Sequence, residues 1–150
     1  MELKIPPLVQ VLLVGAGMLA ISRLIPSLTL SIPANTLIGV VVVLIGATVA
    51  LTGVLEFRKA KTTVDPRYPQ KSEKLVITGI YKISRNPMYL GFLFMLFGWF
   101  VILENVSTLL FLPIFVIYIN HFQIKPEEQF LLKKFGPDFS QYCSKVRRWA

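Results

Sequence analysis

The sequence predicts an all-α, polytopic membrane protein with about four transmembrane helices and a cytoplasmic C-terminal helical tail. Of its 150 residues, 54% are hydrophobic and the mean hydropathy is +0.63, which is more apolar than the core of a soluble domain of this length requires. Apolar stretches that are long enough, or nearly long enough, to cross a bilayer recur along the chain. All Lys and Arg residues except Arg23 fall outside these stretches.

The first two predicted transmembrane helices cover residues 8–25 and 36–55. The second stretch carries no charge over 20 residues, close to the ~20 that a spanning helix needs. Pro26 and Pro33 bracket the polar link between the two stretches and predict a tight turn between antiparallel helices. Because the first stretch runs on to Ile25, we expect it to stay as a spanning helix and not to be removed as a signal peptide.

Residues 88–103 and 107–122 form a second predicted pair of transmembrane helices. Each is shorter than an ideal span, and only residues 104–106 separate them, which predicts a tight hairpin. Asn120 and His121 lie near the end of the second helix of this pair. Lipid does not tolerate such polar groups, so they must face protein or the membrane interface.

All basic residues except Arg23, which lies near the far face, fall on one side of the predicted membrane. They occupy a loop at residues 56–87 and the tail at residues 123–150, together with Lys4, and the chain has a formal net charge of +8. By the positive-inside rule this side is the cytoplasm, which places both termini there. We therefore expect the charge to set the topology and to attract anionic headgroups rather than to bind nucleic acid.

The tail predicts two short amphipathic helices and no further span. The first begins near Pro126, carries Glu127 and Glu128 in its first turn, where they interact favourably with the helix dipole, and stops at Gly136. The second has Asp138 as its predicted N-cap.

The single cysteine and the single histidine limit the possible chemistry. One cysteine, Cys143, excludes an internal disulfide, and one histidine, His121, leaves too few soft ligands for zinc, so no metal site is expected. With no partner near it in sequence, His121 is expected to be packed or interfacial rather than a base. Trp149 is expected to anchor the tail at the membrane interface.

Two polar clusters adjoin the second helix pair on the cytoplasmic side, at residues 78–91 and 123–128. Since the third helix begins at the first cluster and the fourth ends near the second, the hairpin brings both to one rim of the membrane. Pro87 is well placed to open a helix whose free N–H groups, with Arg85 beside them, would hold a carboxylate or another anion.

Four motifs in this half of the chain carry a resemblance to a known family. They are Thr62-Thr63-Val64-Asp65-Pro66, the Gly79-x-Tyr81 turn, Arg85-Asn86-Pro87-Met88-Tyr89-x-Gly91, and Glu127-Glu128-x-x-Leu131-x-x-x-Phe135-Gly136-x-x-Phe139-x-x-Tyr142. In this order and spacing, over about residues 57–149, the chain resembles the isoprenylcysteine carboxyl methyltransferase and phospholipid methyltransferase family of membrane enzymes.

The resemblance implies that S-adenosylmethionine binds in a pocket built by the last two helices and the tail, with its methyl group facing a lipid-accessible tunnel. It implies no Rossmann domain, and the Gly15-x-Gly17 pair inside the first helix is interpreted as a helix-packing site. The candidate cofactor-binding residues are Tyr81, Arg85, Asn86, Pro87, Tyr89, Gly91, Glu127, Glu128 and Tyr142. The candidate catalytic residues are Glu128, Gln123 and Arg85.

The implied function is S-adenosylmethionine-dependent methyl transfer to the carboxylate, amine or thiol of a lipidic or small hydrophobic acceptor. An amine or thiol must first lose a proton, which Glu127 or Glu128 could accept. Adjacent helical residues point about 100° apart, so only one glutamate is expected to face the pocket, and the analogy favours Glu128. The expected partners are the lipid bilayer and this hydrophobic substrate, with no nucleic acid, and the sequence carries no signal for an oligomeric state. The shorter bacterial branch of the family implies a bacterial inner membrane.

At two positions the chain departs from the eukaryotic prenylcysteine enzymes of this family. Those enzymes usually carry His at the position of Asn86 and Arg at the position of Gln123, whereas the shorter bacterial branch has the residues found here. An arginine could pair bidentately with a substrate carboxylate, which a neutral glutamine cannot do. The departure at Gln123 therefore argues against methylation of a prenylcysteine carboxylate.

Two other classes of function remain open from the sequence. Sterol and steroid reductases have a similar Asn/His-Pro-x-Tyr helix start, and such an enzyme would use NADPH. That cofactor carries several negative charges and needs more fixed cations than Arg85 supplies near the hairpin, although the loop lysines could contribute. A non-catalytic membrane scaffold, in which the polar clusters only tie the loop to the tail, would bind neither cofactor.

Overall fold

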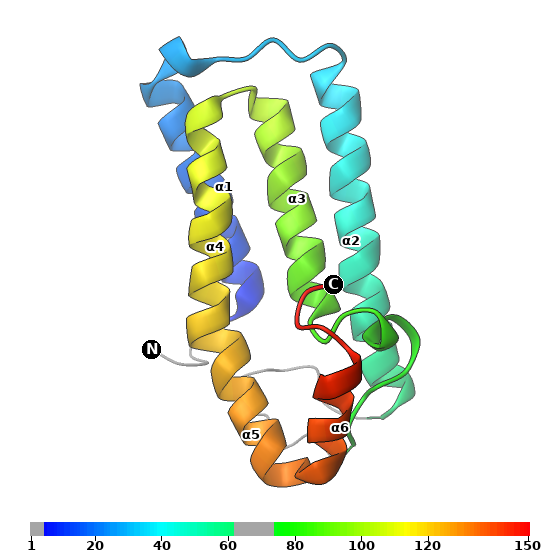
Figure 1. Cartoon of the computed structure of the whole chain (residues 1–150). Helices are drawn as coiled ribbons and strands as arrows, with labels where there is room; N and C mark the ends of the chain where they lie inside the picture. The colour runs from blue at the N-terminus through cyan, green and yellow to red at the C-terminus, as the bar shows by residue number, and fades with distance from the viewer. Residues whose placement is uncertain (1–4, 62–73) are drawn as a thin grey trace.

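The computed structural model describes residues 5–61 and 74–150 and contains no strand within them. Four apolar helices stand side by side (Figure 1). They are α1 (Pro7–Leu24), α2 (Asn35–Lys59), α3 (Pro87–Leu103) and α4 (Phe111–Ile119), and the 3-10 turns of the described chain are η1 (Pro26–Leu28), η3 (Gly79–Lys82) and η4 (Val106–Leu110). The all-α prediction is confirmed. The Thr62–Pro66 motif and the basic residues Lys4, Arg67 and Lys71 lie outside the described residues.

The helices suit a bilayer. α1, α2 and the continuous helical run Val106–Phe135 are long and apolar enough to cross a membrane, and α3 is a shorter apolar helix of 17 residues, about 26 Å long. Many large apolar side chains on the outer faces are more than half exposed, among them Leu12, Leu37, Leu44, Leu51 and Ile117. Only lipid would cover such a surface, so the chain is an integral membrane protein.

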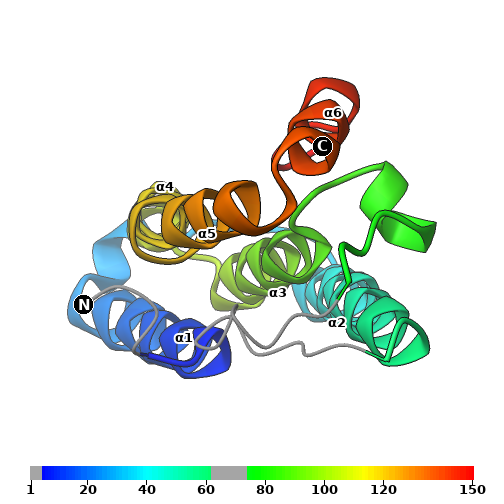
Figure 2. The same ribbon diagram turned by 90° about the horizontal axis from the view of Figure 1, so that it is seen from below.

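α3 lies between α1 and α2, and α4 packs against α1 and α3 (Figure 2). Because α1 and α2 each pack on α3, the link from Ile25 to Ala34 crosses the end of the bundle (Figure 1). The tight turn predicted from Pro26 and Pro33 is therefore wrong.

A seam of glycines holds α2 against α3. Gly39, Gly46 and Gly53 recur at seven-residue spacing on α2, and Gly91 and Gly98 have the same spacing on α3. A Cβ atom added to Gly46 would lie 2.5 Å from the Gly91 carbonyl oxygen, and one added to Gly98 would lie 2.6 Å from the Gly39 carbonyl oxygen. Side chains cannot fit where two backbones approach this closely. The seam therefore fixes the height of α3, and with it the position of its first turn, relative to α2.

In the Gly15-x-Gly17 pair, Gly17 is a close-packing site, as the sequence predicted, whereas Gly15 leaves room for a Cβ atom. A Cβ atom added to Gly17 would lie 2.8 Å from the ring of Phe111, so this glycine makes room for the start of α4. The carbonyl of Gly15 accepts a hydrogen bond from the Trp99 indole N–H at 3.1 Å, which ties α1 to α3.

The two ends of the bundle differ in charge. All described Lys and Arg residues except Arg23 lie at the end where α1 and α3 begin and α2 finishes, which we call the basic end (Figure 1). At the opposite end the two loops bind each other, since Asn105 Nδ2 donates to the Ile25 carbonyl and the Ile32 backbone N–H donates to the Glu104 carboxylate, both at 2.8 Å. The assignment of the basic end to the cytoplasm stays a prediction.

The last predicted transmembrane helix does not stop at residue 122. α4 continues through a π-helical turn, η5 (Asn120–Ile124), into α5 (Lys125–Phe135). Pro126 has no N–H to donate, and a π turn directly before it accommodates the missing hydrogen bond, so the proline does not break the rod.

α6 (Pro137–Lys145) folds back beside α5 (Figure 1). Gly136 allows this reversal because its φ of +50° lies in the region that favours glycine. Gly136 is also the N-cap of α6, and Asp138 lies within the first turn without a capping hydrogen bond. The predicted N-cap role of Asp138 is therefore wrong, because the N-cap lies two residues earlier, at Gly136.

Substitution of Gly91 by Ala is expected to lower the melting temperature of the detergent-solubilised protein, measured by circular dichroism. The new Cβ would lie 2.7 Å from the Ala50 nitrogen, and overpacking of this kind costs about 1–3 kcal/mol. Gly15→Ala is the matched control, because its Cβ would lie 4.0 Å from the nearest atom, in Trp99. This control should melt at or above the wild-type temperature, since alanine is the better helix former. Equal melting temperatures of the two variants would contradict the claim that α2 and α3 are too close at Gly91 to admit a side chain.

Candidate functional site

A pocket opens at the basic end, where the start of α3 faces α5, α6 and η3. Its empty space is about 670 Å³, including the solvent at its mouth. The lining combines cationic, acidic, aromatic and aliphatic side chains, namely Phe57, Lys74, Leu75, Val76, Tyr81, Arg85, Asn86, Met88, Tyr89, Ile124, Glu127, Glu128, Leu131, Phe139 and Tyr142. Both predicted polar clusters contribute, so the prediction that the hairpin brings them together is confirmed. Apolar walls with a few converging polar groups are typical of small-molecule sites.

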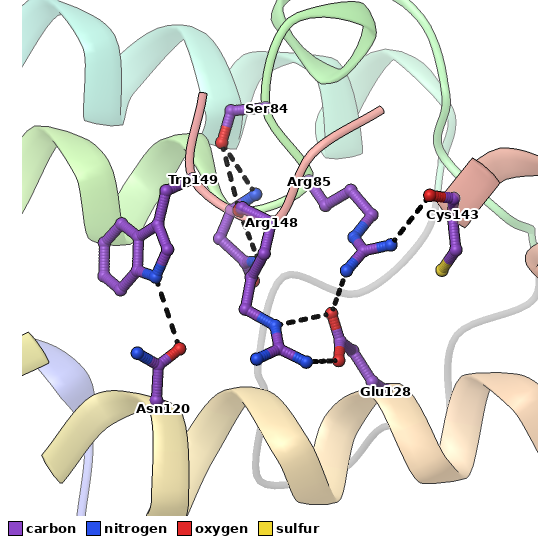
Figure 3. Close-up of polar contacts among 8 residues, drawn as sticks. Ser84, Arg85, Asn120, Glu128, Cys143, Arg148 and Trp149 are labelled. Carbon is purple, nitrogen blue, oxygen red and sulfur yellow. Dashed lines mark hydrogen bonds and ion pairs between the residues drawn. The ribbon is translucent and has the colours of Figure 1, made fainter. Parts of the chain in front are cut away.

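Glu128 is the centre of the charge network of the site (Figure 3). One carboxylate oxygen accepts hydrogen bonds from Arg85 Nη2 at 2.9 Å and from Arg148 Nε at 3.2 Å, and the other accepts from Arg148 Nη2 at 2.6 Å. The hydrogen bonds to Glu128 raise the pKa of the Arg148 guanidinium, which stays charged. A bidentate arginine pair has a defined geometry, so the Glu128 side chain is held in one orientation.

Arg85 keeps one donor without a partner in the pocket wall. Its Nη1 donates to the Cys143 carbonyl at 3.3 Å and its Nη2 donates to Glu128, whereas its buried Nε–H has no partner among the described residues. Leaving a buried donor unpaired costs about 1–3 kcal/mol, so an acceptor on a ligand is favoured at this position. Carboxylate and phosphate oxygens are the acceptors that suit a guanidinium best.

Glu127 and Glu128 both line the pocket. The expectation that only one of them would do so is wrong, because the pocket wraps around the first turn of α5. Glu127 points towards α3, where the Tyr89 hydroxyl donates to its Oε2 at 3.4 Å. Glu128 points towards Arg85 and the C-terminal tail. The two carboxylates therefore differ in how many hydrogen bonds they already accept.

Tyr81 of η3 and Tyr142 of α6 form an aromatic wall. The Tyr142 hydroxyl donates to the Tyr81 carbonyl at 2.7 Å, and the ring of Phe57 meets the ring of Tyr81 edge-on with centroids 5.4 Å apart. Burial raises the pKa of both phenols, so both stay protonated and neutral. Aromatic rings that line a pocket suit a cation or a flat heterocycle.

Cys143 and His121 do not act in this pocket. Burial raises the pKa of the Cys143 thiol, so it stays in the protonated and less nucleophilic form. His121 is exposed, with its ring 4.7 Å from the ring of Phe122. In the described part of the chain, no three His, Cys, Asp or Glu side chains are grouped so that they could hold a metal ion.

Three of the predicted site residues do not line the pocket. Gly91 lies in the glycine seam, and Pro87 is buried in the first turn of α3 next to Gly53. Gln123 is 1% exposed and its Nε2 donates to the Ile5 carbonyl at 2.9 Å, while its Oε1 has no partner in residues 5–61 and 74–150. Its amide donor is therefore used by the start of α1 and is not offered to the pocket.

Two residues near the pocket were not identified from the sequence. Arg148 forms the paired contact with Glu128, and the buried Ser84 hydroxyl donates to the Arg148 carbonyl at 3.4 Å and accepts from the Asn86 N–H at 3.1 Å. Asn86 Nδ2 also donates to the Arg148 carbonyl, at 2.9 Å. No sequence signal marks these residues, because one more arginine in a basic tail and one serine in a polar loop are unremarkable.

Known proteins are similar to this chain over part of its length. The profile of the phospholipid methyltransferase family matches residues 34–138. A probable protein-S-isoprenylcysteine O-methyltransferase of Oryza sativa subsp. indica is 32% identical over 110 residues, which are 73% of this chain and 57% of the rice protein. The protein-S-isoprenylcysteine O-methyltransferase of Schizosaccharomyces pombe is 39% identical over 77 residues, which are 51% of this chain and 32% of that protein.

An uncharacterized protein of Haemophilus influenzae is 45% identical over 62 residues, which are 41% of this chain and 98% of that protein. The chain spans little more than half of the rice enzyme and about a third of the yeast enzyme. No solved structure matches it.

Substitution of Tyr142 by Phe is expected to lower the free energy of unfolding by about 1 kcal/mol, because it removes the donor to the Tyr81 carbonyl. Thermal denaturation in detergent measures this loss. Tyr118→Phe is the matched control, since the Tyr118 hydroxyl makes no hydrogen bond within the described residues and its ring packs on Phe122. The control should melt like the wild type, and an equal loss in both variants would show that the Tyr142 hydrogen bond does not anchor α6.

Proposed function

Because this chain belongs to the phospholipid methyltransferase family, we propose that it transfers a methyl group from S-adenosylmethionine to a lipidic or small hydrophobic acceptor. The proposal takes residues 1–150 as one methyltransferase-like domain with its cofactor pocket at the basic end. The observation that carries it is the unpartnered Arg85 Nε–H in a pocket that also holds two carboxylates and an aromatic wall. The names of the rice and yeast relatives support the reaction class.

The charges of the pocket match those of S-adenosylmethionine, which has a carboxylate, an ammonium group and a sulfonium centre. Arg85 would bind the carboxylate through its Nε–H. Glu127 would accept hydrogen bonds from the ammonium group or the ribose hydroxyls. The π faces of Tyr81 and Tyr142 would attract the sulfonium cation or stack on the adenine. Each charged part of the cofactor therefore has a partner of opposite sign or a π face.

The two glutamates have different proposed roles. Glu128 already accepts three hydrogen bonds from two guanidinium groups, so we assign it to holding Arg85 in place. Glu127 accepts one long hydrogen bond, from Tyr89, so its carboxylate has capacity for a ligand. The structure therefore favours Glu127 over Glu128 as the carboxylate that contacts the cofactor or the acceptor, which revises the choice made from the resemblance.

Methyl transfer requires mainly that the protein place the donor and the acceptor next to each other and exclude water from them. The bound cofactor supplies a methyl group on a positively charged sulfur, which is open to in-line attack. The apolar lining residues Ile124, Leu131 and Phe139 would exclude water from the reacting groups. For an amine or thiol acceptor, Glu127 would take the proton that the acceptor must lose. A carboxylate acceptor would need no base.

The position of the pocket favours an acceptor that comes from the membrane. Tyr89 and Ile124 line the pocket and also belong to the apolar core between α1, α3 and α4. Gln123 brings no positive charge and uses its amide N–H on Ile5, so it does not replace an arginine as the partner of a substrate carboxylate. We therefore favour a lipidic amine or thiol over a prenylcysteine carboxylate.

Calorimetric titration of the purified protein with S-adenosylhomocysteine, the expected product, tests the proposal. The wild-type protein should bind with a micromolar Kd, and Arg85→Ala should bind at least about tenfold more weakly because the carboxylate loses its cation. Lys82→Ala is the charge-matched control, since Lys82 is exposed in the same segment and does not line this pocket. Its affinity should equal that of the wild type.

A parallel titration with NADPH separates the methyltransferase from a reductase. We expect no binding of NADPH. Binding of NADPH alone would replace the proposal with a reductase, and binding of neither ligand would favour a non-catalytic scaffold.

A further inference from the structure

The C-terminal tail docks on the segment that presents Arg85 to the pocket (Figure 3). The backbone N–H of Arg85 donates to the Arg147 carbonyl at 3.0 Å. Asn86 Nδ2 and the Ser84 hydroxyl donate to the Arg148 carbonyl at 2.9 and 3.4 Å. The tail is thus paired through its backbone with the turn directly before α3.

The side chains of the tail reach across to the α4–α5 rod. Arg148 makes its two-point contact with Glu128, and the Trp149 indole N–H donates to Asn120 Oδ1 at 3.3 Å. The indole ring also packs against the apolar core of the bundle. The last residues of the chain therefore connect the start of α3 with α5 and with the π turn.

Arg148 and Arg85 share the carboxylate of Glu128. Arg148 engages both carboxylate oxygens, so Glu128 offers only one contact to Arg85, at Nη2. Without Arg148 the carboxylate could turn to meet Arg85 with both oxygens, since the two-point arginine–carboxylate pair is the preferred geometry. That pairing would occupy the Nε–H of Arg85, which is the donor left for a ligand.

We propose that Arg148, docked by Trp149, is a positioning residue that keeps Glu128 away from the Nε–H of Arg85 and so keeps this donor available to an anionic group of the ligand. This inference rests on the proposed function, because the ligand group in question is the carboxylate of the cofactor. Arg148 does not line the pocket and acts through Glu128. The tail is therefore part of the binding site although it does not touch the ligand.

The test compares the S-adenosylhomocysteine affinity of three variants with that of the wild-type protein by calorimetry. Arg148→Ala should weaken binding about tenfold or more. Lys145→Ala, which removes an exposed positive charge from the same part of the chain, should bind like the wild type. Arg148→Lys keeps the charge but cannot make the two-point contact, so it should show an intermediate loss with the fold intact. Circular dichroism checks that each variant keeps its helical content.

A double-mutant cycle with Glu128→Gln separates positioning from a structural effect. A neutral glutamine cannot form an ion pair with Arg85, so adding Arg148→Ala to Glu128→Gln should weaken binding no further than Glu128→Gln alone. Additive losses would mean that Arg148 does not act through Glu128 and would overturn the inference.

The remaining outcomes distinguish this inference from the proposed function. A wild-type protein that binds no S-adenosylhomocysteine would overturn the proposed function and this inference with it. If the wild-type protein binds S-adenosylhomocysteine and both Arg148→Ala and Arg148→Lys bind it with the wild-type affinity, only the positioning role is overturned. Tighter binding by Arg148→Ala would also overturn it, since the tail would then be competing with the ligand.

Discussion

Glu128 shares its carboxylate between two guanidinium groups, and this three-way ion pair joins the start of α3, the α4–α5 rod and the C-terminal tail. Removing charges from water is costly, so a partly buried ion pair is weak evidence for stability. Removing one of the three partners would leave a partly buried charge without its counter-charge. The free-energy cost of that state keeps the three segments docked on one another. Arg85 and Glu128 also line the pocket, so the geometry of the pocket wall depends on this ion pair being formed.

The bundle supplies the frame for this interaction. The membrane excludes unpaired polar groups from its interior, so the polar residues of the hairpin gather where α3 begins and where α4 leaves the apolar region. The glycine seam with α2 sets the height of α3, and the π turn before Pro126 lets the rod continue to Glu127 and Glu128. The aromatic wall from η3 and α6 completes the lining of the pocket.

The sequence predicts the features that follow from local pattern and topology. Apolar length predicts four membrane helices, and a short hairpin predicts that Arg85 and Glu128 meet. Features that depend on distant partners are not predictable in this way. Gly91 belongs to the same motif as Arg85, but its close neighbours are Gly46 and Ala50 of α2, so it serves packing. Arg148 binds the carboxylate of Glu128, 20 residues away, and the turn at Asn86, more than 60 residues away. A periodic sequence pattern does not predict contacts over such separations.

The central claim is that the basic end of the bundle is a binding pocket for the methyl donor. Hydrogen–deuterium exchange of the detergent-solubilised protein, with and without saturating S-adenosylhomocysteine, tests its location and its ligand together. The account predicts slower exchange in η3 and the start of α3, in the first turn of α5, and in α6 with the tail, and no change in the middle of α1 and α2. Unchanged exchange in these segments, or protection confined to another part of the chain, would contradict it.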